Sequence, residues 1–196
     1  MEILEDYVMA AKKVILFIEG ESNSSNSDLN QGFTKLLEQK LKGKLPKIIL
    51  GDGKGQTINK FLTNQREADL FLLLVDLDKP EDTVEADLVD NNLLNDKENV
   101  FYMIQEMECW FLSQPNILDD FYGLDSRKKK ISEKLPQKKA TEFSEPDKIM
   151  KNLTKDTKKG QYHKIKHAVE LLKLLDATQL EKDFADFERL ITKLKY

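Results

Sequence analysis

The stretch from Asp69 to Pro80 combines an unbroken apolar run with two closely spaced carboxylates, and it constrains the fold more than any other part of the chain. It reads Asp-Leu-Phe-Leu-Leu-Leu-Val-Asp-Leu-Asp-Lys-Pro. A short apolar run that a proline soon ends is typical of a strand buried on both faces, although a short buried helix has a similar composition. If the run is a strand, its side chains alternate, so Asp76 and Asp78 point to the same side.

Three further apolar runs predict strands, and they alternate with predicted helices. The strands cover 14–18, 45–50 and 99–104, and the helix from Leu29 to Leu41 ends before Gly43. Short buried strands that alternate with helices predict an α/β fold with a mostly parallel four-stranded sheet flanked by helices.

The chain changes character beyond residue 112. We expect residues 1–112 to form the α/β core, and residues 113–196 to form a basic connector and a helical extension packed on that core as one structural unit. The extension is predicted to contain a hydrophobic connector at 115–123, an exposed basic arm at 127–139, and amphipathic helices at 162–175 and 180–194.

Carboxylates follow three of the four predicted strands: Glu19, then Asp76 with Asp78, then Glu106 with Glu108. The carboxyl ends of parallel strands meet at one edge of the sheet, where ligands bind. Like charges gathered there would repel one another, and a hard divalent cation would relieve the repulsion. The alternatives are that Asp and Pro only end a strand, and that Glu106 and Glu108 are acids favoured by the dipole at a helix N-terminus.

The segment Gly51–Thr57 reads Gly-Asp-Gly-Lys-Gly-Gln-Thr and follows a predicted strand. Backbone amides around Gly53 and Lys54 could cradle a phosphate. The order and spacing fit neither a Walker A loop nor a dinucleotide-binding fingerprint, and a plain flexible turn is the alternative.

Charge and composition limit the function classes. The net charge of −4 argues against a grip on nucleic acid by the whole surface, but basic residues predominate from Arg127 to Lys166. This basic block would suit a phosphate-containing polymer, or it is simply a set of solvated helix faces. The single cysteine, Cys109, excludes an internal disulfide. The acidic N-terminus and the lack of a long apolar run favour a cytoplasmic protein with no membrane association.

The pair Glu19-Gly20 after the first strand, followed by Asp76 and Asp78 after a later one, resembles the Toprim domain of topoisomerases, primases and OLD-type nucleases. More closely, and over nearly its whole length, the chain resembles a Toprim-like family catalogued as a domain of unknown function, DUF4276. That resemblance also rests on the block Gln-Glu-Met-Glu-Cys-Trp-Phe-Leu at 105–112, on Tyr162-His163-Lys164, on 172–176 and on Phe187. Trp110 and Phe111 in the block are expected in the core.

The resemblance implies a Toprim/Rossmann-like fold and a nuclease-like site that uses Mg²⁺ or Mn²⁺. It implies that Glu19 is a metal ligand or an acid/base group and that Asp76 and Asp78 hold metal. OLD-type loops usually carry a second carboxylate four residues after the first Glu, where this chain has Asn23. A second metal would then need Glu21, Asp28, Glu106 or Glu108.

The resemblance also implies partners. Members of this group are often encoded beside an ABC-type ATPase in bacterial or phage-defence loci, so an ABC/AAA-type ATPase is an expected partner, and a homodimer is also considered. Lys164 or Lys79 could contact the phosphate or protonate the leaving oxygen, with solvated surface positions as the alternative. His163 and His167 have metal-compatible spacing but lack a third ligand.

Three functions remain open at this point. The first is a metal-dependent nuclease acting on DNA or RNA. The second is a catalytically degenerate Toprim-like module for regulation or interaction, which Asn23 and the net acidity favour. The third is a nucleotide-binding or phosphotransfer enzyme of flavodoxin-like fold, which depends mainly on the glycine-rich segment.

Overall fold

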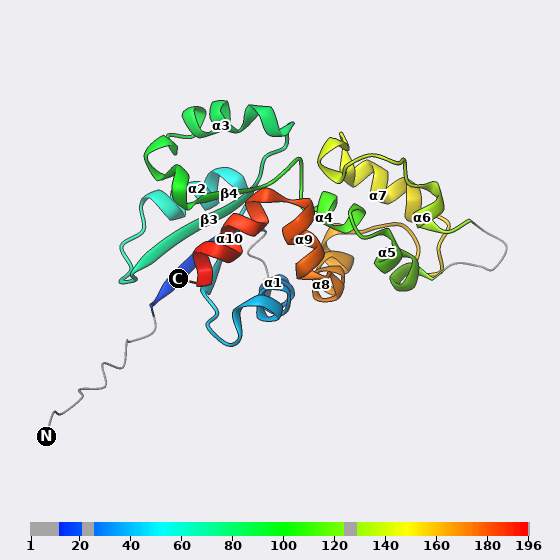
Figure 1. The fold of residues 1–196 in the computed structure, drawn as a ribbon, viewed down its shortest axis with the longest axis horizontal. Helices are drawn as coiled ribbons and strands as arrows, with labels where there is room; N and C mark the ends of the chain where they lie inside the picture. The colour runs from blue at the N-terminus through cyan, green and yellow to red at the C-terminus, as the bar shows by residue number, and fades with distance from the viewer. Residues whose placement is uncertain (1–11, 21–25, 124–128, 196) are drawn as a thin grey trace, which may run out of the picture.

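A parallel four-stranded sheet organises the structure. The computed structural model describes residues 12–20, 26–123 and 129–195, with the backbone alone at 26–28. The strands β1 (Val14–Glu19), β2 (Lys47–Gly51), β3 (Leu70–Asp76) and β4 (Val100–Met103) lie in the order β2-β1-β3-β4, and every neighbouring pair is parallel (Figure 1). The predicted α/β fold with a four-stranded sheet is therefore confirmed, and the sheet is wholly parallel.

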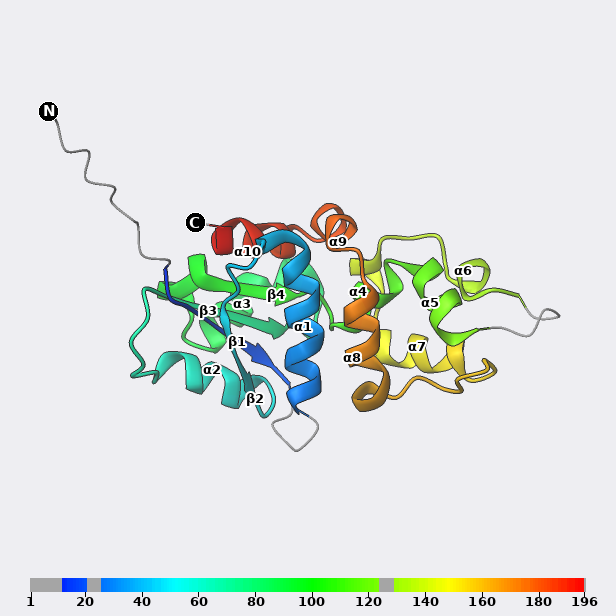
Figure 2. The same cartoon turned by 90° about the horizontal axis from the view of Figure 1, so that it is seen from below.

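Helices cover both faces of this sheet, as Figure 2 shows from a second direction. They are α1 (Asn26–Leu41), α2 (Lys54–Leu62), α3 (Val84–Asp90), α4 (Glu108–Leu112), α5 (Pro115–Tyr122), α6 (Ile131–Lys134), α7 (Pro146–Thr154), α8 (Lys164–Leu174), α9 (Ala177–Asp183) and α10 (Ala185–Lys195), with short 3₁₀ turns at Glu81–Thr83, Leu94–Asn99 and Ala140–Glu142. The larger core packs α1, α8 and α10 on one face, and a smaller core packs α2 and α3 on the other.

Alternating side chains explain why the strands are apolar throughout. In β1, Leu16 and Ile18 belong to the larger core, while Ile15 and Phe17 belong to the smaller one. All four are at most 1% exposed. A strand sandwiched between two helical layers has no solvent face, so an unbroken apolar run is what its position requires.

The register aligns the carboxyl ends of the strands. Glu19 of β1 lies opposite Gly51 of β2, and Asp76 of β3 lies opposite Met103 of β4. The acidic residues that end β1 and β3 therefore meet at the same edge of the sheet, as predicted.

Trp110 joins the helical extension to the sheet. Its ring lies 5.2 Å from that of Phe187 and 6.4 Å from that of Phe33, centroid to centroid, in edge-to-face arrangements. Trp110 and Phe111 are at most 1% exposed, which confirms their predicted place in the core. The extension shares this core with the α/β part of the chain, because the larger cluster runs from β1 to α10.

The extension differs from the prediction in three places. The expected connector at 115–123 is mostly helix α5, and the expected exposed arm at 127–139 contains helix α6 with Ile131 fully buried. Asp119 anchors α6, because its carboxylate accepts the backbone N–H groups of Ile131 and Ser132. The expected helix at 180–194 is two helices, since the backbone is extended at Phe184. Phe184 thereby reaches the Trp110 ring.

In the part of the chain that the structure describes, no helix combines the length and apolar character needed to cross a bilayer.

Candidate functional site

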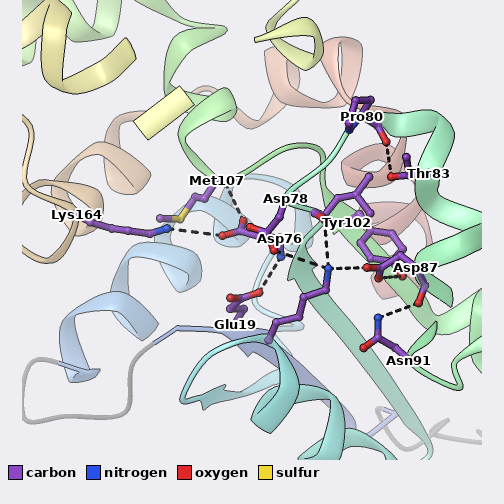
Figure 3. Close-up of polar contacts among 12 residues, drawn as sticks. Glu19, Asp76, Asp78, Pro80, Thr83, Asp87, Asn91, Tyr102, Met107 and Lys164 are labelled. Atoms are coloured by element: carbon purple, nitrogen blue, oxygen red, sulfur yellow. Dashed lines mark hydrogen bonds and ion pairs between the residues drawn. The ribbon is translucent and has the colours of Figure 1, made fainter. Parts of the chain in front are cut away.

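Glu19 and Asp76 form the centre of the site at the carboxyl edge of the sheet. The Asp76 backbone N–H donates to Glu19 Oε2 over 3.0 Å, which ties the last residue of β1 to the last residue of β3 (Figure 3). Burial raises the pKa of Glu19, the hydrogen bond from Asp76 lowers it, and the negative charge of Asp78 raises it, with a net increase.

Asp76 is the more buried of the two, with 5% of its surface exposed. Its Oδ1 accepts the Met107 backbone N–H over 2.8 Å, so the loop before α4 fixes the carboxylate (Figure 3). Burial raises the pKa of Asp76 well above its usual value; Lys164 opposes the increase, and the charges of Glu19 and Glu108 add to it.

Asp78 occupies a turn and not a strand. Strand β3 ends at Asp76, and Asp78 has a left-handed φ of 60°. Its N–H donates to the Gln105 carbonyl over 2.6 Å, and its side chain is 57% exposed. The expected strand alternation therefore does not extend to Asp78, whose direction depends on the turn.

Lys164 brings a positive charge to these carboxylates from the other end of the sequence. It is the first residue of α8, and its Nζ lies 3.7 Å from Asp76 Oδ2 and 3.6 Å from Glu108 Oε2. Burial lowers the pKa of Lys164, but the surrounding carboxylates, Asp76 first, raise it above its usual value overall. Its side chain is 51% exposed, so the amine is also open to a ligand.

Glu106 and Glu108 have different environments. Glu108 is fully buried, and its Oε1 accepts the hydroxyl of Tyr162 over 2.7 Å. Its Oε2 accepts no hydrogen bond from the part of the chain that the structure describes. Glu106 is half-buried, and burial and then the Glu108 charge raise its pKa. The buried Glu108 therefore forms an ion pair with Lys164. Glu106 is not among the described residues that line the cavity in front of Asp76.

A cavity of about 600 Å³ lies in front of the carboxylates. Its lining includes Glu19, Asp76 and Lys164, and also Gly53 from the start of α2. The predicted site residues that the structure brings to this cavity are thus those of β1, β3 and α8, joined by one glycine of the Gly51–Thr57 segment.

Lys54 belongs to a separate polar network. Its Nζ donates to Asp87 Oδ1 over 2.9 Å and to the Leu77 carbonyl over 3.3 Å. The Tyr102 hydroxyl donates to Asp87 Oδ2 over 2.9 Å (Figure 3). The amine lies 3.9 Å from Asp78. Lys54 therefore holds the end of β3 against α3, and its predicted contact with phosphate stays a prediction.

The other predicted residues lie at the margin or beyond. Lys79 is exposed in the turn before Pro80. Glu21 lies outside the described residues, and so does the side chain of Asp28. His163 lines the cavity, whereas His167 turns its Nδ1 to the Tyr122 hydroxyl at 3.0 Å.

The carboxylates suit Mg²⁺ only in an open arrangement. Among the residues that the structure describes, no group of three or more His, Cys, Asp or Glu side chains converges to hold a metal ion. Mg²⁺ keeps several waters, however, and often takes one or two carboxylates plus a substrate phosphate. Glu19 and Asp76 offer two carboxylates at the cavity, and Oε2 of Glu108 lies 3.6 Å from the amine of Lys164. These residues fit a hydrated ion and do not fit a closed protein cage.

Three contributors escaped the sequence analysis as site residues. Tyr162 holds Glu108, the Met107 amide holds Asp76, and Lys151 lines the cavity. Tyr162 lies 54 residues from Glu108 along the chain, so no local spacing could connect them. The only signals were the 105–112 block, which contains Met107, and the Tyr162-His163-Lys164 block, both of which counted toward the resemblance.

Residues 11–195 match the family described as a domain of unknown function, DUF4276. The chain belongs to this family. No curated protein and no solved structure matches it. The match spans the sheet, the cavity and the helical extension, so all the described site residues lie within the DUF4276 domain.

Proposed function

We propose that this DUF4276 chain is a nuclease dependent on Mg²⁺ or Mn²⁺ that hydrolyses phosphodiester bonds of DNA or RNA. The observation that carries the proposal is the meeting of two carboxylates, Glu19 and Asp76, with the amine of Lys164 in one cavity. The resemblance of the Glu-Gly and Asp-x-Asp elements to Toprim domains and OLD-type nucleases supports it.

Each residue of the site has a separate role in the proposed reaction. Glu19 and Asp76, with Asp78 beside them, would hold the ion, and a bound Mg²⁺ supplies stabilisation of phosphoryl charge and activation of water. Lys164 carries a positive charge at neutral pH and would contact the phosphate from beside Asp76, 3.7 Å from its Oδ2. Glu108 would keep the Lys164 amine in place from behind.

The test is cleavage of plasmid, single-stranded DNA and tRNA with Mg²⁺ or Mn²⁺. We expect Asp76→Asn, Glu19→Gln and Lys164→Met each to slow cleavage roughly 100-fold or more, because each removes a charge from the reacting centre. Asp186→Asn is the matched control, since Asp186 also accepts a backbone N–H, from Tyr102, but does not line the cavity. Cleavage that survives the three cavity substitutions would contradict the proposal.

A metal-induced shift of the melting temperature distinguishes a non-catalytic module from a nuclease that needs a partner protein for cleavage. We expect Mg²⁺ or Mn²⁺ to raise the melting temperature of the wild type and not that of Asp76→Asn. Neither cleavage nor a shift would favour the second candidate, a non-catalytic Toprim-like module. The observation that favours this candidate is that Glu19 and Asp76 each accept a backbone N–H, and thus have a structural task already.

Regulation by an ABC/AAA-type ATPase in a bacterial or phage-defence system remains part of the proposal. A clear metal shift without cleavage would support it, and cleavage that appears on addition of the ATPase would establish the requirement. The homodimer and the cytoplasmic location remain predictions.

A further inference from the structure

The cavity has two chemically different walls. An apolar wall comes from three parts of the chain: Leu29 of α1, the pair Met103 and Met107, and the pair Ala168 and Val169 of α8. Figures 1 and 2 both place α1 and α8 side by side, which brings the first and last of these together. Flexible methionine side chains adapt to flat, polarisable groups, so this wall suits an aromatic ring.

The second wall is basic and adjoins the first, because Lys164 and Ala168 lie one turn apart on α8. Lys151, His163 and Lys164 line it, and Lys151 and Lys164 have side chains 46% and 51% exposed. Lys151 also pairs with Asp147 of its own helix over 2.7 Å. The N-terminus of α8 begins at Lys164, and its cap residue His163 makes no side-chain capping hydrogen bond. The positive end of the helix dipole adds to the two amines in favouring a phosphate there.

We infer that the cavity receives one unpaired nucleotide, with the base against the apolar wall and the phosphate between Lys164 and the carboxylates. The volume of about 600 Å³ lies within the roughly 300–1,000 Å³ of pockets that enclose a single small molecule. A base inside it must leave its partner and its stack, which favours single strands or flipped nucleotides over intact duplex. This inference rests on the proposed nuclease function and specifies its substrate class.

Mononucleotide binding tests the inference without catalysis. The probe is adenosine 5′-monophosphate in the presence of Mg²⁺, which contains no internucleotide bond to cut, and calorimetry measures its affinity. Ile165→Glu places a carboxylate at the mouth of the cavity, whereas Leu174→Glu introduces the same charge on the same helix outside the lining. The two native side chains are similarly exposed, at 49% and 51%.

We expect Ile165→Glu to weaken binding at least tenfold and Leu174→Glu to leave it within twofold. Ala168→Trp fills the cavity and should abolish binding; if that variant fails to fold, the exposed pair Ile165 and Leu174 still decides. Wild-type affinity for a single-stranded oligonucleotide should exceed that for the duplex of the same sequence by at least tenfold.

The outcomes separate this inference from the proposed function. Nucleotide binding that depends on Ile165, without cleavage of any substrate by the chain alone or with an added ATPase, would support the inference and overturn the nuclease. Cleavage without nucleotide binding, or with equal use of duplex and single strand, would support the nuclease and overturn the inference. Competition by inorganic phosphate as effective as that by the nucleotide would also overturn it, because the base would then contribute nothing.

Discussion

Glu108 is fully buried, and one of its carboxylate oxygens accepts no hydrogen bond from the residues that the structure describes. Tyr162 satisfies the other oxygen, and Lys164 lies 3.6 Å from the unpartnered one. A buried carboxylate that loses a donor bears the cost of its desolvation. Tyr162, which also lines the cavity, therefore stabilises the buried carboxylate that faces Lys164.

We predict that Tyr162→Phe lowers the free energy of unfolding by about 1–3 kcal/mol, because it leaves Glu108 without its hydroxyl donor. Urea denaturation of both proteins measures the difference. In a Glu108→Gln background, where the hydroxyl of Tyr162 no longer faces a buried carboxylate, the same change should cost less. Equal losses in the two backgrounds would show that the tyrosine contributes packing alone.

The sequence predicted the acidic residues of the site but not the residues that hydrogen-bond to them. Glu19 and Asp76 were found because they end apolar runs, and parallel strands bring such ends together. Met107 and Tyr162 act through a backbone amide and a contact across 54 residues, and neither leaves a local pattern. The separate environments of Glu106 and Glu108 were equally hidden, since adjacent acids look alike in a sequence.

Among the elements, the junction of β2 and α2 depends on a glycine. A Cβ at Gly51 would lie 2.0 Å from Thr57 Oγ1 and 2.6 Å from the Thr57 Cα. Thr57 is fully buried, and its hydroxyl donates to the Gly53 carbonyl over 2.7 Å. Because a backbone atom is involved, the first turn of α2 would have to move to admit any side chain.

We predict that Gly51→Ala lowers the free energy of unfolding by about 1–3 kcal/mol through this overpacking. Gly55→Ala is the matched control, since a Cβ there meets nothing within 4 Å and lies inside α2. Because Gly55 is the second residue of α2, the control should raise stability by less than about 0.5 kcal/mol, as alanine is the better helix former. A Gly51→Ala protein as stable as the wild type in urea would refute the crowding argument.

The strands were predictable at the level of elements because burial on both faces leaves an unbroken apolar signal. The extension was less so. Helix α6 depends on Asp119, which comes from another helix, and the break between α9 and α10 lets Phe184 reach Trp110. Apolar periodicity continues through that break, so the sequence pattern alone favours one helix.

At the scale of the molecule, the reactivity of Cys109 measures whether the core shared by the sheet and the helical extension is closed. Cys109 is 0% exposed, and burial raises the pKa of its thiol to about 12. Because the thiolate is the reactive form, labelling requires opening of the structure. We predict that a disulfide reagent at about pH 8 labels native Cys109 at least 100-fold more slowly than the protein unfolded in urea.

Cys109→Ser with Leu174→Cys provides the accessible comparison, since Leu174 is 51% exposed. That protein should react at once in its native state. If native Cys109 reacted as fast as this surface thiol, the sheet and the helical extension would not form the common core described above.

The two outer strands of the sheet each meet a polar side chain from a helix. Asp186 of α10 accepts the Tyr102 backbone N–H of β4 over 2.8 Å. On β2, Lys60 of α2 donates to the Leu50 carbonyl over 3.3 Å and Asn30 of α1 to the Ile48 carbonyl over 3.5 Å. The Gly51 carbonyl accepts from Gly20 on the inner side, so the alternating carbonyls of Leu50 and Ile48 point outward.

A strand from a neighbouring molecule would have to displace these side chains before it could pair with either outer strand. Side chains from the protein's own helices thus occupy backbone groups at both edges of the sheet. Growth of an intermolecular β-ribbon from either outer strand is thereby opposed.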